Sequence, residues 1–469
     1  MKLDGLERYN KTVSAISTPP GKGGVALIRT SGSEAVAIAA RCFVPRCGKS
    51  LEDCPPRTAV YGDILLEGKK IDDGIATVFR APGSFTGEDV VEITCHGGIT
   101  VTGAVLRALF LAGSEPASAG EFTRRAFLAG KLTLTEAEAI GDLLEAGSIG
   151  QLELFSYDSR SRLSGEIREL HDRLVGVLSR LFAAIDFPDE DIERFTDDGL
   201  SDEIAALRAR LSRLASTFDT GRAIALGVPT VICGSPNVGK SSLYNLLCRE
   251  EAAIVTELAG TTRDLLRERI TLGRVTLELC DTAGIRAETD DRIERIGIER
   301  SLGEMERAEL LIGVFDASRE RGEDDMRLIS RLSELRARGA RVIILNNKCD
   351  LPAVSPITAE DGEFDAVFNI SAVTGEGSSE LESAVDAMFI DGSLSLGEDA
   401  VVATQRQHAA LVRALDCLDG AICALSGGVA PDAASGELEL ALGELDGLDG
   451  RGVSEEIVDG IFSKFCVGK

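Results

Sequence analysis

Apolar residues in the first part of the chain fall in short runs that adjoin turn-forming residues. The runs at 25–28, 75–79 and 90–94 each lie next to a stretch rich in Pro or Gly. Short apolar runs bounded in this way are typical of strands. Residues 1–130 are therefore expected to form an α+β domain.

From residue 131 the apolar spacing changes to steps of three and four. The first such stripe comprises Leu163, Ile167, Leu170, Leu174, Val177, Leu178, Leu181 and Ile185. This spacing predicts one long helix, and Pro188 is expected to end it. A second helix is expected to start near Ser201, with Asp202 and Glu203 at the positive end of its dipole. Residues 131–225 are interpreted as the first part of a helical domain.

Residues 226–388 alternate between strand and helix patterns. The strand candidates are 229–233, 275–280, 309–316, 341–346 and 367–370. Short apolar runs separated by amphipathic segments predict a parallel, doubly wound sheet with helices on both faces.

Helical spacing returns in residues 389–469. It runs through Leu411, Leu415, Leu418, Ile422 and Leu425. In the last helix Ile457, Ile461 and Phe465 are expected to share one face. Helical segments on both sides of an α/β block indicate that the α/β domain is inserted into a split helical domain.

Composition narrows the class of protein. With 469 residues, about three domains are expected, and the absence of an apolar segment near ~20 residues argues against a spanning helix. The N-terminus has no leader pattern, and the cysteines are scattered, as in a reducing cytoplasm. The trio Cys42, Cys47 and Cys54 lacks a paired CxxC, which favours packed thiols over zinc. We therefore expect a cytoplasmic protein that has no membrane contact.

The most informative motif is Gly-Ser-Pro-Asn-Val-Gly-Lys-Ser at 234–241, which follows a strand pattern and precedes a helix pattern. In such a P-loop the backbone N–H groups cradle phosphate oxygens at a helix N-terminus. Lys240 is expected to reach the β- and γ-phosphates, and the Ser241 hydroxyl is expected to bind Mg²⁺.

Further motifs follow in the order that a GTPase requires. Asp281-Thr282-Ala283-Gly284 ends a strand candidate, where an acid anchors Mg²⁺ and a glycine N–H meets the γ-phosphate. Asn347-Lys348-Cys349-Asp350 follows another strand candidate, 341–346. The Asp350 carboxylate can accept hydrogen bonds from guanine N1–H and N2–H. Ser371-Ala372 is expected to complete the base pocket. Together these motifs favour GTP over ATP.

Two features of the intervening segment concern hydrolysis. Gly260-Thr261-Thr262-Arg263-Asp264 lies where a switch loop would place a Thr hydroxyl on Mg²⁺, although an ordinary polar turn is the alternative. Ile285 follows Gly284, where signalling GTPases carry a water-orienting Gln. An apolar side chain cannot orient water, so another group is expected to do so.

Several motifs resemble the tRNA uridine-modification GTPase MnmE (TrmE) family over nearly the whole chain. They are the P-loop, 252–264, Glu294–Arg300, Pro19–Gly24, Ser84–Asp89, His96–Gly98 and the terminal Phe465–Lys469. The resemblance implies a homodimer with an N-terminal folate-binding domain, a split helical domain and an inserted G domain.

The resemblance also implies a reaction and a partner. With MnmG (GidA), which carries FAD, such proteins place an aminomethyl or carboxymethylaminomethyl group on carbon 5 of the wobble uridine of certain tRNAs. The complex would be a heterotetramer or larger. The one-carbon unit would come from a tetrahydrofolate derivative, in its methylene or 5-formyl form.

The resemblance accounts for the missing Gln through K⁺, which supplies charge stabilisation between paired G domains. The implied K⁺ ligands are Asn237, Thr256, Leu258 and Thr261, and the implied Mg²⁺ ligands are Ser241 and Thr262. Glu294 would orient water, the alternative being a solvated carboxylate at a helix start. The residues expected to contact GTP are Asn237, Val238, Gly239, Lys240, Ser241, Ser242, Thr256, Glu257, Leu258, Thr261, Thr262, Asp281, Thr282, Ala283, Gly284, Asn347, Lys348, Asp350, Ser371 and Ala372.

The implied folate positions are Arg29, Glu92, Lys131 and Lys469. Cys466, at the end of the last expected helix, is either a catalytic nucleophile or a packed thiol. A net charge of −27 opposes contact with a phosphate backbone. Arg124, Arg125 and Lys131 are the local basic residues that could help, and the partner is expected to supply most tRNA contacts.

Two other interpretations stay open at this level. A ribosome-assembly GTPase would share the nucleotide motifs but normally carries a basic RNA-binding appendage, whereas the flanking segments here are acidic. A nucleotide-switched scaffold would have no chemistry of its own.

Overall fold

The computed structural model describes all residues except 1–10, 187–196, 252–267, 280–302, 427–430 and 469. Its contacts divide the chain into two compact units, Met1–Gly141 with Asp446–Lys469, and Asp142–Leu445. Among the described helices, none combines the length and apolarity needed to cross a membrane. The predicted boundaries of the three domains stay a prediction.

A seven-stranded sheet forms the centre of the first unit, in the order β3-β4-β5-β6-β2-β1-β7. Its strands are β1 (Val13–Ile16), β2 (Val25–Ser31), β3 (Phe43–Pro45), β4 (Ala59–Leu66), β5 (Lys69–Phe79), β6 (Val90–His96) and β7 (Glu115–Pro116). Neighbouring strands are antiparallel except β1 and β7. All three strands predicted from apolar runs are present, which confirms the α+β interpretation.

Two helices, α1 (Ala35–Cys42) and α2 (Ile99–Leu111), bury their apolar residues against this sheet. A second, smaller apolar cluster joins α4 (Leu134–Glu145) to α16 (Glu455–Phe462) through Leu134, Ala137, Val458 and Phe462. The short elements η3 (Leu51–Asp53) and α3 (Glu121–Leu128) complete the unit. The cluster packs α16, from the last part of the chain, into the same unit as the N-terminal sheet.

The predicted face of the last helix needs correction. Val458 and Phe462 are the buried residues of α16, whereas Ile457 is 48% exposed. The helix ends at Phe462, so Phe465 and Cys466 lie beyond it. The short helix follows a turn with two left-handed glycines, Gly450 and Gly452. Ile461 and Phe465 are partly buried and pack against the same cluster as Val458 and Phe462, so Ile457 alone departs from the predicted face.

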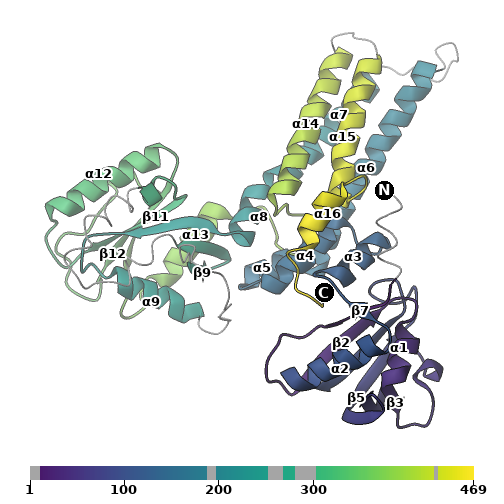
Figure 1. The fold of residues 1–469 in the computed structure, drawn as a ribbon. Helices are drawn as coiled ribbons and strands as arrows, with labels where there is room; N and C mark the ends of the chain where they lie inside the picture. Colours follow the sequence, from purple (N-terminus) through teal and green to yellow (C-terminus); the bar gives the residue numbers. More distant parts are fainter. Residues whose placement is uncertain (1–10, 187–196, 252–267, 280–302, 427–430, 469) are drawn as a thin grey trace. The chain divides into compact units, whose positions relative to one another are not determined.

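Long helices dominate the helical part of the second unit (Figure 1). They are α6 (Tyr157–Asp186), α7 (Asp197–Ser216), α14 (Gln405–Ser426) and α15 (Pro431–Asp449), with the shorter α5 (Ile149–Leu154) and α8 (Phe218–Ala225). Two side chains from each long helix line a common apolar interior: Leu170, Leu174, Leu207, Leu211, Ala414, Leu418, Ala441 and Leu445. Helix α6 is described as far as Asp186, and Pro188, which was predicted to end it, lies outside the described residues. Helix α7 begins four residues earlier than expected, so Asp202 and Glu203 lie within it rather than at its start.

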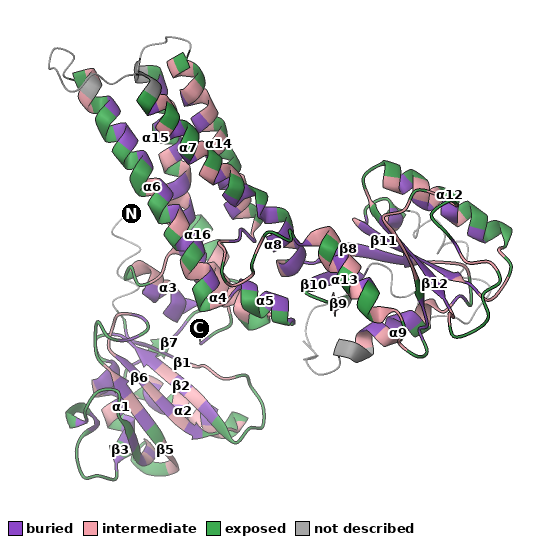
Figure 2. Ribbon diagram, turned by 180° about the vertical axis from the view of Figure 1, so that it is seen from behind, coloured by how far each residue is buried: buried purple, intermediate pink, exposed green. Residues whose placement is uncertain are grey.

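A six-stranded sheet in the order β13-β12-β11-β8-β10-β9 forms the rest of this unit. Its strands are β8 (Val228–Cys233), β9 (Glu268–Leu272), β10 (Val275–Leu279), β11 (Leu310–Asp316), β12 (Arg341–Asn347) and β13 (Ala366–Ile370), and its helices are α9 (Lys240–Glu251), α12 (Glu323–Ala337) and α13 (Ser378–Phe389). Residues 310–315 of β11 are buried without alternation, which requires cover on both faces. Figure 2 shows this buried centre in β8, β11 and β12.

All five strands predicted for this sheet are present. Their first and last residues agree with the prediction within one residue wherever the structure describes them. The five predicted strands pair in parallel, as expected. An additional edge strand that was not predicted, β9, pairs antiparallel with β10. A tight turn at Gly273 joins the two strands. The half-polar sequence of β9 gives no strong strand signal, which is common at a sheet edge.

Candidate functional site

The loop at 234–239 joins β8 to α9 at the carboxyl end of the parallel strands. Asn237 and Gly239 have φ values of 61° and 99°. Such left-handed positions turn successive N–H groups toward one concave side, where an anion binds. A Cβ at Gly239 would lie 2.2 Å from Asn347 Nδ2, so this position requires glycine. The loop therefore has the shape of a phosphate cradle.

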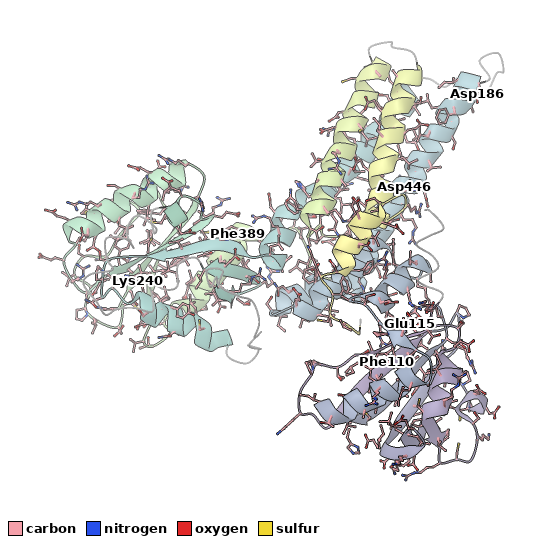
Figure 3. All side chains as sticks on the ribbon, viewed as in Figure 1. Phe110, Glu115, Asp186, Lys240, Phe389 and Asp446 are labelled. Carbon is pink, nitrogen blue, oxygen red and sulfur yellow. The ribbon has the colours of Figure 1, made fainter. Side chains whose placement is uncertain are left out.

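Lys240, labelled in Figure 3, is the first residue of α9. Its ammonium group turns back over the loop. Its Nζ donates to the carbonyl oxygens of Gly234 and Ser235, each at 2.9 Å. Ser241 follows in the first turn of the helix. A positive helix end, an ammonium group and an adjacent hydroxyl fit a phosphate chain with its Mg²⁺.

Asn347 links three of the predicted segments through one buried side chain. It is 2% exposed. Its Nδ2 donates to the Val238 carbonyl at 2.7 Å, and its Oδ1 accepts from the Ala372 N–H at 3.0 Å. The loop after β12 is thereby fixed to both the phosphate loop and the Ser371-Ala372 turn.

Lys348 and Asp350 follow Asn347 at the end of β12. Lys348 has a φ of 66°, and its Nζ donates to Asp316 Oδ2 at 2.6 Å and to the Asn237 carbonyl at 3.2 Å. Burial alone would raise the pKa of Asp316, but hydrogen bonds from Lys348 and Ser318 outweigh it and lower that pKa. The Asp350 carboxylate is on an exposed residue at the same edge, which suits it to receive a base.

Part of the predicted site lies outside the described residues. These predicted positions are Thr256, Glu257, Leu258, Thr261, Thr262, Asp281, Thr282, Ala283, Gly284, Glu294 and Lys469. Among the predicted residues that the structure describes, Asn347 is the last residue of β12. The others lie in the loops or helix starts that follow β8, β12 and β13: Asn237, Val238, Gly239, Lys240, Ser241, Ser242, Lys348, Asp350, Ser371 and Ala372.

In the first unit, Arg29 and Glu92 are partners across β2 and β6. Arg29 Nη2 and Nε lie 2.7 and 2.9 Å from Glu92 Oε1. The guanidinium also lies over the rings of Phe85 and Phe122, at 5.7 and 5.4 Å from their centroids. A charged pair beside aromatic rings can receive a flat, polar heterocycle.

Lys131 is connected to the Arg29–Glu92 pair through the loop that carries Phe85. Its Nζ donates to the Pro82 carbonyl at 2.7 Å and to the Ser84 carbonyl. The lysine thus braces the segment that carries Phe85 beside Arg29. The structure brings Arg29 and Glu92 together, and it connects Lys131 to them through this loop.

The C-terminal segment is attached to the same unit. Val467 forms a bridge with Ala119, and the Ser17 hydroxyl donates to the Gly468 carbonyl at 2.8 Å. A Cβ at Gly468 would lie 2.2 Å from the Ile16 carbonyl oxygen. Cys466 is exposed rather than packed, so the packed-thiol interpretation was wrong.

The local basic residues expected to help with tRNA are otherwise engaged. Arg125 is 3% exposed and pairs with Glu88 and Glu121. Arg124 pairs with Asp459, and Lys131 is bonded as described. Arg125 is therefore unsuited to contact a phosphate backbone, because its charge is buried and already neutralised.

Two residues of the nucleotide region, Asp316 and Asp325, were not identified from the sequence. Ser235 lies in the predicted motif at 234–241, but no role was predicted for its side chain. Asp316 ends β11, and Asp325 lies in the first turn of α12. An acid at the end of a buried strand, followed by a helix start, was a signal available for both. Their contacts with Lys348 and Ser235 could not be read from the sequence.

The chain matches two family models. The model described as the MnmE helical domain covers residues 134–466, and that described as the GTP-binding protein TrmE N-terminus covers residues 12–131. The curated tRNA modification GTPase MnmE of Clostridioides difficile (strain 630) is 37% identical over 462 residues, which is 98% of this chain and 99% of that protein. The protein of the same name from Geobacillus kaustophilus (strain HTA426) is 38% identical over 463 residues, with the same coverage.

Among solved structures, a crystal structure of Era with MgGDPNP and a 16S ribosomal RNA segment matches with a TM-score of 0.26 and 23% identity. It covers 40% of this chain and 65% of that one. A similarity this low supports no conclusion about function. The two family models and the full-length relatives agree with the motifs and the topology: this chain belongs to the MnmE family of tRNA modification GTPases.

Proposed function

We propose that the chain is a K⁺-activated GTPase that modifies carbon 5 of the wobble uridine of certain tRNAs together with a flavin-dependent partner. The observation that carries the GTPase part is the contact of Asn347 with both Val238 and Ala372. It ties the predicted phosphate loop and both predicted base-binding loops into one site. The full-length relatives bear the name tRNA modification GTPase MnmE, which supports the tRNA part of the proposal.

For hydrolysis, the chain's own residues would divide the work. The loop at 234–239 and Lys240 would bind the β- and γ-phosphates, and Ser241 with Thr262 would hold Mg²⁺. Asp350 would select guanine, because its carboxylate can accept from both guanine N–H groups. Glu294 would orient the water in place of the missing Gln.

K⁺ would add positive charge at the phosphates as these separate. Asn237, Thr256, Leu258 and Thr261 are its proposed ligands. Of these, Asn237 lies in the described loop, with its backbone in a left-handed conformation and its carbonyl held by Lys348. This supports a fixed position for Asn237 in the site.

The hydrolysis proposal is tested by comparing GTP turnover by the full chain in K⁺ and in Na⁺ at equal ionic strength. We expect turnover to be at least about tenfold faster in K⁺, because charge stabilisation at a transition state is of that order or larger. Equal rates in the two salts would contradict the K⁺ part and leave the GTPase part standing.

For the one-carbon step, we propose that Arg29, Glu92, Lys131 and Lys469 bind a tetrahydrofolate derivative in its 5-formyl or methylene form. The paired charges of Arg29 and Glu92 beside Phe85 and Phe122 support this. When bound, the folate supplies the one-carbon unit. Cys466 is a candidate nucleophile, since it is exposed and follows Phe465 in the attached C-terminal segment.

The proposed assembly is a cytoplasmic homodimer that binds MnmG (GidA), with FAD on that partner, in a heterotetramer or larger complex. The acidity of the chain favours a partner that supplies most tRNA contacts. Titration of the full chain with 5-formyltetrahydrofolate would separate this proposal from a ribosome-assembly GTPase or a scaffold. Saturable binding is expected, and no binding at all would favour those alternatives.

A further inference from the structure

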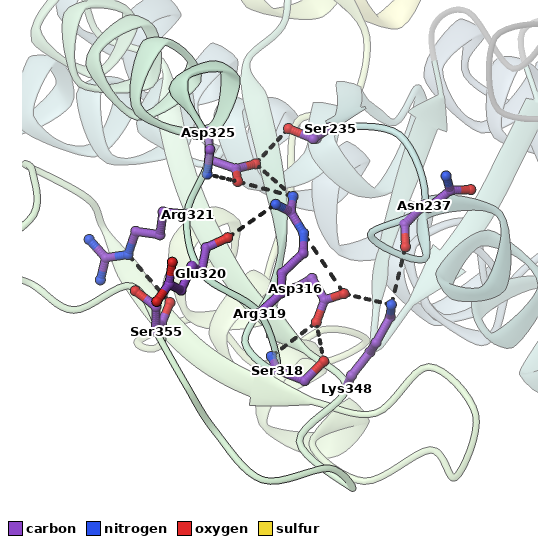
Figure 4. Close-up of polar contacts among 12 residues, drawn as sticks. Ser235, Asn237, Asp316, Ser318, Arg319, Glu320, Arg321, Asp325, Lys348 and Ser355 are labelled. Atoms are coloured by element: carbon purple, nitrogen blue, oxygen red, sulfur yellow. Dashed lines mark hydrogen bonds and ion pairs between the residues drawn. The ribbon is translucent and has the colours of Figure 1, made fainter.

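The segment from the end of β11 to the first turn of α12, residues 316–325, connects to the phosphate loop through two acids that lie outside the predicted motifs, Asp316 and Asp325 (Figure 4). The Ser235 hydroxyl donates to Asp325 Oδ1 at 2.5 Å. The carbonyl of the same Ser235 accepts from Lys240 Nζ at 2.9 Å. A short path therefore runs from the start of α12 through Ser235 to the P-loop lysine.

Asp325 has two roles that use different oxygen atoms. Its Oδ2 accepts from the Gly322 N–H at 2.9 Å, which satisfies a free donor at the start of α12. Its Oδ1 is used for Ser235. A residue that only capped its helix would need one of these contacts, so the second indicates a role outside the helix.

The charge of Asp325 is buried and neutralised where it lies. The residue is 3% exposed, and Arg319 Nη2 lies 3.0 Å from its Oδ2. Burial alone would raise the pKa of Asp325, but the hydrogen bonds from Ser235 and Gly322 outweigh it and lower that pKa. A buried carboxylate supplied with donors in this way has one well-defined position.

A second connection meets the phosphate loop two residues further along. Asp316 accepts from Lys348 Nζ at 2.6 Å, and Lys348 donates to the Asn237 carbonyl at 3.2 Å. Arg319 lies between the two carboxylates, 4.0 Å from Asp316 and 3.0 Å from Asp325. The phosphate loop is thus held at Ser235 and at Asn237 by one polar network.

We propose that Asp325 is a positioning residue of the nucleotide site, which acts through the Ser235 hydroxyl to fix the first turn of the phosphate loop. The proposal rests on the GTPase function stated above. By holding Ser235, Asp325 sets the place of the backbone groups that would meet the phosphates. Nucleotide affinity, and not only the stability of α12, should therefore depend on this one hydrogen bond.

The test is a double-mutant cycle with Ser235→Ala and Asp325→Asn, in which the dissociation constant of GDP is measured on the full chain. Ser235→Ala removes the hydrogen bond but leaves the cap on Gly322, so the unfolding midpoint without nucleotide should stay close to that of the parent. Each single change should weaken GDP binding about tenfold, as expected for a lost hydrogen bond to a charged group. The double variant should bind no more weakly than Asp325→Asn alone, because the two residues act as one unit.

Asp361→Asn is the matched control. Asp361 Oδ1 lies 2.5 Å from Nη1 of Arg321, which is in the loop at 317–322. Among the described residues, Asp361 has no contact with Ser235 or Lys240. This variant should keep the parent's GDP affinity within about twofold, because changes at residues that share no contact with the site act independently of it.

Two results would overturn the proposal: GDP affinity of Ser235→Ala within twofold of the parent, or losses in the double variant that simply add. A coupling that appears in the unfolding free energy but not in GDP affinity would assign Asp325 to structure alone. If the parent chain itself bound no guanine nucleotide, the GTPase function would fail instead, so the two failures are distinguishable.

Discussion

The nucleotide site and the Arg29–Glu92 site are built from the chain in different ways. The first is made of groups within a few consecutive residues, the backbone of the loop at 234–240 and the side chains at 347–350, which lie at the ends of strands. The second is made of side chains that are 63 residues apart in sequence and meet because β2 and β6 pair in one register. Sites built from consecutive residues are thus specified by short motifs, whereas sites built from side chains on separate strands depend on how those strands align.

This difference leads to different sensitivities. In the nucleotide site, a Cβ at Gly239 would meet the Asn347 amide at 2.2 Å, so the loop depends on the absence of a side chain. In the other site the Arg29 charge is matched by Glu92, whose side chain is 24% exposed, and a ligand would have to compete with that pairing. Changes in one site should leave the other intact, since the two lie in different units.

The largest effect is expected from Lys240→Ala. Loss of the ammonium group that stabilises the transferring phosphate should reduce GTP turnover by about a hundredfold or more. Steady-state phosphate release from GTP would measure this. Binding of 5-formyltetrahydrofolate by the same variant should be unchanged, and its loss would show that the two sites are not independent.

The next largest effect is expected from Asp350→Asn. Replacing the carboxylate removes two charge-assisted hydrogen bonds to guanine, which should weaken GTP binding about a hundredfold. Xanthosine triphosphate, which offers a carbonyl where guanine has its amino group, should bind the variant better than the parent. Competition between the two nucleotides would measure the exchange, and an unchanged preference for GTP would remove Asp350 from the base pocket.

A smaller effect is expected from Glu92→Gln in the first unit. The amide keeps the shape but removes the charge that pairs with Arg29, and binding of 5-formyltetrahydrofolate should weaken about tenfold. Isothermal titration would measure this, with GTP turnover as the internal control. If GTP turnover fell while folate binding stayed unchanged, Glu92 would belong to the GTPase site and not to the folate site.

The smallest effect is expected from Gly468→Ala. Gly468 has a φ of 102°, and a Cβ there would lie 2.2 Å from the Ile16 carbonyl oxygen. Alanine would strain this conformation by about 1–3 kcal/mol, so the C-terminal segment should detach more often. Faster digestion by a carboxypeptidase would report the release. Gly460→Ala, in the open surroundings of α16, is the matched control and should not accelerate digestion.

The same contrast between local and distant contacts explains which secondary-structure elements could be predicted from the sequence. The strands of the inserted sheet were predicted within one residue, because buried parallel strands appear as uninterrupted apolar runs such as 310–315. The edge strand β9 was missed, since three of its five residues are polar and it lies at the edge of the sheet. In α16, Ile457 departs from the predicted face, because eight residues contain too few turns to fix a face.

Among site residues, the motifs located Lys240, Asn347 and Asp350 because their spacing is local. Asp325 was missed, since its contact with Ser235 spans 90 residues and depends on how α12 packs. For Arg125, its basic side chain suggested an exposed charge, but Glu88 and Glu121 bury and neutralise it. Partners that are distant in sequence decide such cases, and a single sequence does not display them.

The central claim is that GTP hydrolysis by this chain serves the modification of the wobble uridine. The most direct measurement is nucleoside mass spectrometry of tRNA from a host that lacks its own MnmE-family protein and expresses either this chain or its Lys240→Ala variant at matched levels. The account predicts that the parent chain restores the modified uridine and that Lys240→Ala does not. Equal restoration by both proteins, or restoration by neither when the host's partner enzyme is present and active, would contradict it.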